Sequence, residues 1–353
     1  MIEKTKKVVF FTRYAENGAS SRLRFLQYIP ILNKHGIEIK VKNFFSKQYL
    51  KNKYKKKSYG ITKIFKLYLK QFKFLLENHK DFNTTWFIEY ELLPFIPYFI
   101  EKLFLKNRRY ILNFDDNVWE KYQRAPFKYF LKNKYYKLIK NAKNVIVANH
   151  FLADKVKQYN DNIVFIPTAI DATKYQRHQN GKFERFTVAW IGTPETFHYV
   201  RNSSSIWQKL AEKVDYKFLI IARESLKDYE INGVDMEFIN WSERIEATLL
   251  PQCHIGVMPL DDSNFSLGKS AYKIIQYFAS GVVPIASNVG ENNHVIHNNH
   301  DGFLVQNDDQ WVSVIEELYN DRNLLERLSI NATASAKKFD IKVYSEKILS
   351  LID

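Results

Sequence analysis

Two successive runs of alternating strand and helix patterns constrain the fold of this chain more than any other feature of its sequence. The first run opens with an apolar segment at residues 8–12, a polar loop, a helical pattern that stops at Gly36 and an alternating segment at residues 37–44. Strand, helix and strand in this order form a βαβ unit, which is typical of a mostly parallel sheet. Further strand-like segments follow at residues 84–90, 108–114 and 144–150.

The second half of the chain repeats this pattern and starts with its own first strand. We therefore predict an α/β fold of two Rossmann-like domains, at residues 1–170 and 185–335. A polar segment rich in turn-forming residues, at residues 171–184, is the predicted linker. The last helical stretch is long enough to pack across both halves, and its final part, about residues 336–353, is expected to pack back on the first domain.

The composition limits the class of protein. Of 353 residues, 46% are hydrophobic and 16% are aromatic, which is enough to build packed cores and excludes global disorder. A single cysteine, Cys253, excludes a disulfide framework and a cysteine-rich zinc site. No run of about 18 uncharged apolar residues is present, and the first residues lack the pattern of a cleavable signal. We therefore expect a cytoplasmic protein without a membrane-spanning helix.

Positive charge is concentrated in the first half of the chain. Residues 1–170 contain 34 Lys and Arg against 13 Asp and Glu, whereas residues 171–353 contain 19 against 25. Residues 47–80 alone contain 11 Lys and one acidic residue. Within this segment lysines recur at helical spacing, and apolar residues occupy another face of the same predicted helix. The lysines are Lys63, Lys66, Lys70 and Lys73, and the apolar residues are Ile64, Leu67, Phe74 and Leu75.

A second basic stretch contains Lys128, Lys132, Lys134, Lys137 and Lys140. Basic amphipathic helices lie on anionic membrane surfaces, where each well-placed lysine contributes about 1 kcal/mol. We therefore expect peripheral attachment to the inner face of the cell membrane through these Lys-rich N-terminal helices. The alternative is a solvated lysine face. Nucleic acid is not expected as a partner, because no recognition module accompanies the charge.

The loop after the first strand contains the first candidate binding residues. Gly18 permits a close backbone approach, Ser20 and Ser21 offer hydroxyls and amides at a helix start, and Arg22 can bind an oxyanion through its guanidinium group, as can Arg24. Ordinary helix capping is the alternative role of the two serines. The loop does not match the glycine fingerprint of a nicotinamide site, so that cofactor is not expected.

Two adjacent carboxylates, Asp115 and Asp116, follow a predicted strand in the first half. They can orient a sugar hydroxyl, act as a general base, bind a metal or cap the next helix. The sequence offers no obvious third metal ligand, so we favour a catalytic role for one of them in binding or deprotonating a hydroxyl. Glu91 follows another strand and is a weaker candidate of the same kind.

Glycine-bearing loops also follow strands of the second half. Gly192 and Thr193 form one such loop, whose amides can hold a phosphate. Gly290 and Asn292 belong to another loop that we expect to face the same crevice. His294 follows as a further possibility, although a lone histidine is more often a surface or packing residue.

The helix start at residues 268–273 is the stronger signal in the second half. Gly268 precedes a helix whose first turns contain Lys269 and Lys273, four residues apart. Two ammonium groups on one helical face, beside unpaired amides, can bind a diphosphate. A solvated pair of cations is the alternative, and Lys269 is the residue that we expect to act in catalysis.

Several segments together resemble a known family. The chain contains ASSRLRFLQYIPIL, YILNFDDNVW and IPTAID in the first half, and WIGTP and GKSAYKIIQYFASGVVPIAS in the second. Residues 281–287, followed by residues 301–305, resemble the donor-site signature of GT-B glycosyltransferases, specifically glycosyltransferase family 4, or group 1. The resemblance covers nearly the whole chain. The sequence looks like a branch of this family that is found in bacterial envelope polysaccharide synthesis.

This resemblance implies a GT-B fold, in which two Rossmann-like domains have parallel sheets that face each other across a cleft. It implies that the C-terminal domain holds a nucleoside-diphosphate-sugar donor and the N-terminal domain binds a glycan or lipid-linked acceptor. It also implies a retaining hexosyltransferase that needs no metal or other cofactor. Two alternatives remain, namely a GT-B sugar-nucleotide epimerase or phosphorylase and a non-catalytic glycosyltransferase-like binding subunit.

The chain departs from the usual pattern of the family at its donor site. The family usually has two glutamates across this helix, and the corresponding residues here are Gly268 and Gln276. Gln276 can still bind a ribose hydroxyl as a neutral amide. The arginine and lysine that usually follow the first strand of the C-terminal domain are also absent, and we expect Lys269 and Lys273 to replace them.

Overall fold

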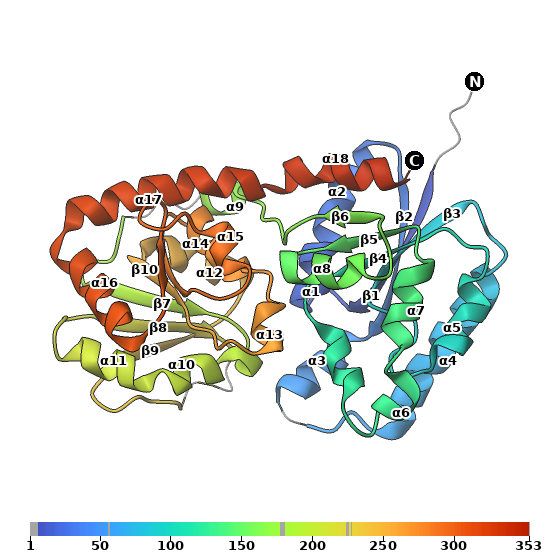
Figure 1. Cartoon of the computed structure of the whole chain (residues 1–353), viewed down its shortest axis with the longest axis horizontal. Coiled ribbons are helices and arrows are strands. Elements are labelled where there is room, and N and C mark those ends of the chain that lie inside the picture. The colour runs from blue at the N-terminus through green and yellow to red at the C-terminus, as the bar shows by residue number, and fades with distance from the viewer. Residues whose placement is uncertain (1–5, 56, 177–180, 224–225, 227, 353) are drawn as a thin grey trace. The chain divides into compact units, whose positions relative to one another are not determined.

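The structure is a computed structural model that describes residues 6–55, 57–176, 181–223, 226 and 228–352. The chain forms two compact units, which are labelled in Figure 1 by their helices and strands. The first unit contains Met1–Thr168, Gly268–Ser270 and Lys342–Asp353, and the second contains Ala169–Leu267 and Ala271–Ile341. Residues 177–180 of the predicted linker and Lys56 of the predicted basic stretch lie outside the described residues.

A parallel sheet forms the centre of the first unit. Its strands lie in the order β2-β1-β3-β4-β5-β6, and each neighbouring pair is parallel. Val9 of β1 pairs with Lys40 on one side and with Trp86 on the other. The strands are β1 (Lys7–Tyr14), β2 (Glu38–Phe45), β3 (Thr84–Glu89), β4 (Tyr110–Phe114), β5 (Asn144–Val147) and β6 (Ile163–Phe165).

Strands β3 and β4 are buried along their whole length, as expected for central strands of a parallel sheet that helices cover on both faces. Trp86, Phe114 and Leu75 are among the side chains that fill the core. The helices of this unit are α1 (Ala19–Arg24), α2 (Ile29–Lys34), α3 (Lys47–Tyr54), α4 (Ile61–Asn78), α5 (Tyr98–Leu105), α6 (Lys128–Leu131), α7 (Lys134–Asn141) and α8 (His150–Lys157), with 3-10 turns η1 (Leu26–Tyr28) and η2 (Val118–Gln123).

The second unit has its own parallel sheet, with strands in the order β12-β11-β10-β7-β8-β9. Trp190 and Trp207 lie in its core together with Ile285. The predicted α/β architecture with two parallel sheets is confirmed. The strands are β7 (Thr187–Ile191), β8 (Lys217–Ala222), β9 (Met236–Asn240), β10 (Ile255–Met258), β11 (Val283–Ser287) and β12 (Phe303–Val305).

The helices of the second unit connect these parallel strands. α14 (Tyr272–Ala279) is followed by Gly281 at φ +60°, the left-handed conformation that glycine favours at a helix end. The other helices are α9 (Thr173–Gln176), α10 (His198–Asn202), α11 (Ser204–Ala211), α12 (Glu243–Leu249), α13 (Asn264–Leu267), α15 (Asn292–Val295), α16 (Asp308–Asn320) and α17 (Arg322–Ala336), with 3-10 turns η3 (Pro194–Thr196), η5 (Leu250–Gln252) and η6 (Lys337–Phe339).

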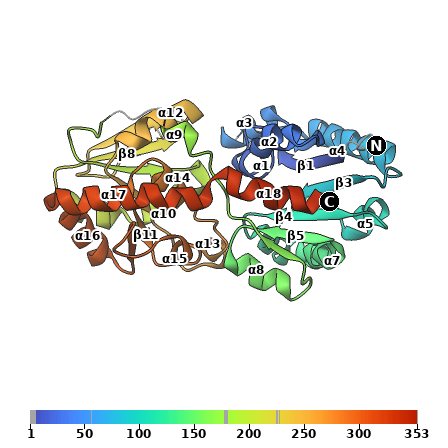
Figure 2. The same cartoon turned by 90° about the horizontal axis from the view of Figure 1, so that it is seen from above.

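The last helix, α18 (Ile341–Ile352), belongs to the first unit from Lys342 onward. Arg109 donates a hydrogen bond from Nη2 to the carbonyl oxygen of Leu351 at 3.2 Å. Figure 2 shows α18 in red, viewed from the side on which it covers the strands of the first unit. This contact places the end of the chain on the first unit.

Two details of the basic stretches differ from the sequence-based expectation. Lys134, which we expected among the membrane-facing lysines, has a side chain that is only 1% exposed and pairs with buried carboxylates. In α4, Phe74 and Leu75 are buried in the core of the first unit, so they do not form a free apolar face. Periodicity identified α4, but the second basic stretch forms two helices, α6 and α7. Periodicity also could not show which side of each helix faces the core.

Helices long and apolar enough to cross a bilayer do not occur among the described residues.

Candidate active site

The strand order of each sheet indicates where a ligand can bind. In the first sheet the chain leaves β1 towards β2 on one side and returns to β3 on the other. In the second sheet β7 has the corresponding position, between β8 and β10. Ligands of open parallel sheets bind at such switch points, beyond the carboxyl ends of the strands. The residues that follow β1, β3, β7 and β10 are therefore the strongest candidates for ligand binding.

Asp115 lies at the carboxyl end of β4 and is held by two hydroxyl groups. Tyr90 donates its hydroxyl hydrogen to Asp115 Oδ1, and Ser20 donates to Asp115 Oδ2. Tyr90 adopts φ +64°, a backbone conformation that is uncommon for a tyrosine. Burial, followed by the charge of Asp115, raises the pKa of the Tyr90 phenol well above its usual range, which keeps it a donor. Both carboxylate oxygens of Asp115 thus have internal partners.

Ser21 and Gly18 shape the backbone beside this cluster. The Ser21 hydroxyl donates to Glu89 Oε2 at 2.6 Å and accepts from the amide of Tyr14 at 2.9 Å. A Cβ on Gly18 would lie 2.5 Å from Cβ of Tyr14, so a larger residue does not fit. Ser21 is fully buried. Both residues therefore build the loop itself, in the positions that the sequence predicted for ligand binding.

The two arginines of α1 have different surroundings. Arg24 is buried, donates from Nε to Asn113 Oδ1 at 3.0 Å and donates from Nη1 to the carbonyl oxygen of Ile166 at 2.7 Å. Burial lowers the pKa of Arg24, against the opposing effect of the Asp115 charge. Arg22 is half-buried on the same helix. Of the two, Arg22 is the more accessible to an anion.

Glu91, after β3, is the centre of a buried charge network. Its carboxylate is 3.0 Å from Arg13 Nη1 and 2.5 Å from Lys134 Nζ, and it also accepts hydrogen bonds from Tyr122 and Tyr135. Burial opposes ionisation, but Lys134 and Arg13 together lower the pKa of Glu91 below its usual value. Such a network fixes the end of β3, and Glu91 has no surface from which to reach a substrate.

Lys269 and Asp116 lie together in the first unit, although Lys269 comes from the second half of the sequence. Lys269 Nζ lies 3.3 Å from Asp116 Oδ2 in an ion pair. The Lys269 side chain is 14% exposed and the Asp116 side chain is 31% exposed. Gly268, the preceding residue, accepts a hydrogen bond on its carbonyl oxygen from Asn149 Nδ2 at 2.8 Å. The structure thus pairs two of the three residues that the sequence predicted for catalysis. The prediction that Lys269 shares a helical face with Lys273 is wrong, because α14 begins only at Tyr272.

Close packing explains the missing glutamate at position 268. A Cβ on Gly268 would lie 2.6 Å from Cβ of Asn117 and 3.1 Å from its amide nitrogen. Side-chain carbon atoms do not approach neighbouring atoms this closely, so the loop accepts only glycine in this conformation. The glutamate that the resemblance implies at position 268 would therefore not fit this loop.

In the second unit, Gly192 follows β7 and is covered by two side chains. A Cβ on Gly192 would lie 2.6 Å from the Trp190 ring and 3.0 Å from Cε of Lys273. Lys273, on the first turn of α14, holds its ammonium group 5.6 Å from the centre of the Trp190 ring. Thr193 begins the turn η3 and accepts from the amide of Thr196 at 3.0 Å. The structure thus brings Gly192, Thr193 and Lys273 together at the switch point.

Asp261, which the sequence indicated together with Asp262 as a donor-sugar contact, is joined at this edge of the sheet by residues that the sequence did not single out. The Asp261 carboxylate, after β10, accepts hydrogen bonds from Ser263 Oγ at 2.6 Å and from Ser266 Oγ. Tyr199 and Ser266 share a hydrogen bond of 2.8 Å between their hydroxyls. Burial opposes ionisation of Asp261, but the serine hydrogen bonds lower its pKa. The signal that could have found these residues is the run of small polar residues directly after β10.

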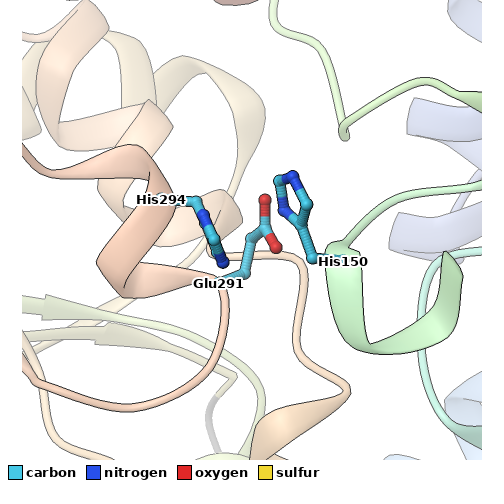
Figure 3. A group of neighbouring side chains, drawn as sticks. All are labelled: His150, Glu291 and His294. Carbon is cyan, nitrogen blue, oxygen red and sulfur yellow. The ribbon is translucent and has the colours of Figure 1, made fainter. Parts of the chain in front are cut away.

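The loop after β11 contains the remaining predicted residues. Gly290 adopts φ +56°, and a Cβ there would lie 3.1 Å from the backbone of Leu267. Asn292 is buried and donates from Nδ2 to the carbonyl oxygen of Ser287 at 2.9 Å, so it stabilises its own loop. Glu291 and His294 come from the same turn at α15, and Figure 3 shows their side chains as sticks.

Gln276 is engaged in a buried polar network rather than lying on an open surface. Its side chain hydrogen-bonds to the Tyr175 hydroxyl, which donates to Glu246 Oε1. Trp241 donates from Nε1 to Glu246 Oε2 at 2.8 Å. Burial, and then the charge of Glu246, raises the pKa of Tyr175 well above its usual range. These contacts connect α14 with α9 and α12.

The fold is that of the GT-B glycosyltransferases, as comparison with solved structures shows. A glycosyltransferase from Rickettsia africae is similar over 99% of this chain and 98% of its own, with 15% identity and a TM-score of 0.70. HepE from Anabaena, in complex with UDP and glucose, is similar over 98% of both chains, with 14% identity and a TM-score of 0.64. WaaG, a glycosyltransferase involved in lipopolysaccharide biosynthesis, is similar over 98% of this chain and 99% of its own, with 12% identity and a TM-score of 0.70.

The sequence itself also carries a family signal. Residues 187–321 match the family model described as Glycosyl transferases group 1. This range begins at β7 and includes the loops after β7, β10 and β11. No curated protein sequence matches the chain. The GT-B fold predicted from the sequence is confirmed, and the family match lies on the second unit.

Proposed function

We propose that this protein is a retaining glycosyltransferase that moves a hexose from a nucleoside-diphosphate-sugar to a glycan or lipid-linked acceptor. One observation carries the proposal. The loops at the switch point of the second sheet, after β7 and β10, fall inside the range that matches Glycosyl transferases group 1. Switch-point loops are the ligand-binding places of open parallel sheets, so the family signal and the topology agree on one location.

The donor chemistry proposed here is stabilisation of a leaving diphosphate. Charge develops on the phosphate oxygens as the glycosidic bond breaks, and fixed cations and amides lower that barrier. Lys273, beside Gly192 in the second unit, supplies the cation for this role. The HepE structure contains UDP and glucose, which supports the same class of donor for this fold.

Asp116 is the residue that we propose for positioning the acceptor hydroxyl. Asp115 beside it has both carboxylate oxygens occupied by Tyr90 and Ser20, so it serves to hold the strand end. Asp116 is more exposed and lies against Lys269. Correct placement of a hydroxyl can supply much of the rate of a group transfer, and a nearby carboxylate can also accept its proton.

The biological setting that we propose is cell-envelope polysaccharide synthesis at the cytoplasmic face of the membrane. WaaG, which has the same fold, is involved in lipopolysaccharide biosynthesis, and this supports an envelope role. Lys63, Lys66, Lys70 and Lys73 are all exposed on α4, as attachment to an anionic surface requires.

The proposed reaction uses protein groups in place of a metal ion. In the second unit, the ammonium group of Lys273 beside the glycine loop at Gly192 can offset the charge of a diphosphate without a divalent cation. Turnover in the presence of a chelator is therefore expected to equal turnover without it. A loss of turnover that Mg²⁺ or Mn²⁺ restores would contradict this part of the proposal.

A panel of sugar nucleotides in a thermal-shift assay, followed by a transfer assay with the donor that binds, tests the function. A bound donor raises the melting temperature by an amount set by its concentration relative to its dissociation constant. Asp116→Asn is expected to lower turnover and leave the donor-induced shift unchanged, and NMR of the product is expected to show a retained anomeric configuration.

Other outcomes would identify a different activity. Conversion of the donor sugar without any acceptor would indicate an epimerase or phosphorylase. Binding of no sugar nucleotide, with no transfer to any acceptor, would indicate a non-catalytic subunit and would overturn the proposal.

A further inference from the structure

Helix α4 exposes a row of large apolar side chains to solvent. Phe65 is 60% exposed and Leu69 is 52% exposed, and Ile61 and Leu76 are also exposed. These residues are four or seven positions apart, so they lie on one side of the helix. Solvent-exposed apolar residues are ordinary when isolated, but a continuous row indicates a binding surface.

The row is separate from both other sides of α4. The core side contains Gln71, Phe74 and Leu75, which are all buried. The basic side contains Lys63, Lys66, Lys70 and Lys73, which are all exposed. At 100° per residue, the exposed apolar residues occupy the third side, between the core side and the lysines. A surface helix needs one apolar side that faces the core and one polar side that faces solvent. The exposed apolar row is a third side, so packing against the core of the first unit does not explain it.

Helix α5 extends the apolar surface. Phe72 of α4 contacts Phe104 of α5, with ring centres 6.1 Å apart. Phe99 and Leu103 of α5 are 65% and 71% exposed. Leu69 is one turn before Phe72, and Leu103 is next to Phe104, so exposed apolar side chains adjoin the contact from both helices. We call the residues Phe65, Leu69, Phe99 and Leu103 the apolar ridge.

Positive charge from strand β2 adds to the basic side of α4. On the edge strand β2, Lys40 and Lys42 hold their ammonium groups 4.7 and 5.1 Å from the ring centre of Phe74. Burial, and then the charges of Lys70 and Lys40, lowers the pKa of Lys42. The fold therefore holds like charges of β2 and α4 close together. An anionic surface would relieve this repulsion.

We propose that the apolar ridge inserts into the headgroup region of an anionic bilayer while the flanking lysines contact lipid phosphates. This inference rests on the membrane attachment proposed above and adds the mode of attachment, which is insertion of side chains rather than adsorption of lysines alone. Interfacial helices bind through buried apolar area and through attraction to anionic lipids, and the first unit presents both on adjoining faces. A second copy of the chain is a poor occupant, since it would bring the same positive charge against the ridge.

Insertion and adsorption respond differently to salt. Charge attraction alone is largely screened at about 1 M salt, where the Debye length is about 3 Å. Apolar burial persists under those conditions. Binding to vesicles of phosphatidylcholine and phosphatidylglycerol is therefore expected to weaken with salt but to remain measurable.

An environment-sensitive fluorophore on the ridge tests insertion directly. Cys253 is buried, so Leu69→Cys provides the accessible thiol for an NBD label. The emission is expected to shift to the blue when these vesicles are added. Ile330→Cys, an exposed apolar position on α17 of the second unit, is the matched control and is expected to show no shift. If the label at Leu69→Cys shows no blue shift although the protein is bound to the vesicles, the proposal is overturned.

A substitution pair measures the contribution of the ridge. Phe65→Ser with Leu69→Ser is expected to lower the vesicle partition coefficient by roughly 10-fold to 1000-fold, because two large apolar side chains no longer leave water. Ile330→Ser is the control and is expected to change nothing. Both positions of the pair are exposed, so the melting temperature should stay near that of the parent protein.

The possible failures are distinguishable. If the serine pair binds vesicles normally while loss of Lys63, Lys66, Lys70 and Lys73 releases the protein, attachment is electrostatic and the ridge proposal fails alone. If the parent protein does not bind the vesicles of phosphatidylcholine and phosphatidylglycerol, the proposed membrane attachment fails together with the ridge proposal. If the ridge variants instead lose an acidic protein partner and not lipid, the surface is a protein interface. Transfer to a soluble acceptor reports the proposed catalytic function separately in each case.

Discussion

In the first sheet, strands β3 and β4 are followed by carboxyl groups, whereas in the second sheet β7 is followed by a glycine and β11 ends in a serine. Glu89 and Glu91 end β3 in a network of internal hydrogen bonds and ion pairs. In the second unit, Ser287 at the end of β11 accepts from the amide of Leu260 at 2.9 Å, and Gly192 follows β7. At these strand ends, the first unit is held by hydrogen bonds and ion pairs of carboxyl groups and the second by close packing of its backbone.

This difference shows how two similar sheets can serve different ligands. A network of buried charges holds its residues rigidly, and its donors and acceptors bind one another rather than a ligand. Glycine loops bring the main chain close to a ligand and leave amides for phosphate oxygens. This difference supports the proposed function, which assigns the acceptor hydroxyl to the first unit and the diphosphate to the second.

The largest expected effect comes from breaking the charge network of the first unit. Lys134→Met leaves the carboxylates of Glu91 and Glu101 buried without their shared cation. Removing one partner from a buried ion pair typically costs about 3–5 kcal/mol. Urea unfolding followed by circular dichroism is expected to show an earlier transition. Lys137→Met, an exposed position on the same helix, is the control, and an equal midpoint for both variants would contradict the network's role.

Lys269→Ala is expected to have the next largest effect, on catalysis rather than on folding. Loss of one charge-stabilising donor typically costs about 2–4 kcal/mol in the transition state, or roughly 30-fold to 1000-fold in turnover. The steady-state rate of sugar transfer measures this loss. Lys209→Ala, which removes a surface cation of the second unit, is expected to leave the rate unchanged. Normal turnover of the Lys269 variant would remove it from the site.

Gly290→Ala tests the backbone packing of the second unit. The position combines φ +56° with a Cβ contact of 3.1 Å to the backbone of Leu267. The left-handed conformation costs a non-glycine residue roughly 1–2 kcal/mol, and the contact adds to this. Gly233→Ala is the matched control, because Gly233 has φ +76° with open space around it. Thermal unfolding of the two variants should therefore differ, and equal destabilisation would show that the contact is unimportant.

The remaining expected effect depends on pH and concerns Glu89. Burial, and then the charge of Asp115, raises the pKa of Glu89 from 4.5 to about 8 in the folded protein. Its stabilising contribution is therefore complete below about pH 4.5 and is lost as the pH rises through about 8, by at most about 1.4 kcal/mol per pH unit. Glu89→Gln cannot ionise and is expected to lose less stability over this range.

Urea midpoints at about pH 6 and about pH 8 measure the difference between Glu89→Gln and the parent protein. Glu38→Gln, at an exposed position, is the control. Parallel pH profiles for the parent and the Glu89 variant would show that Glu89 is ionised in both states.

The sequence predicted those features that depend on short-range order. Helical and strand periodicity identified both parallel sheets, and the rule that ligands bind after parallel strands selected Asp115, Asp116, Gly192 and Lys273. Periodicity could not show that Lys134 points inward, because its two carboxylate partners come from other elements far along the chain. For the same reason it could not show that Gln276 meets Tyr175, or that Gly268–Ser270 joins the first unit.

The close approach of Gly268 to Asn117 has a consequence for how this loop can change during evolution. A Cβ at position 268 would enter the space of Asn117 Cβ, so substitutions at the two positions are expected to depend on each other. A smaller side chain at position 117 does not remove this contact unless it is glycine, because Cβ and the backbone of Asn117 make it. A relative with a glutamate at position 268 should therefore have a displaced loop or a glycine at position 117.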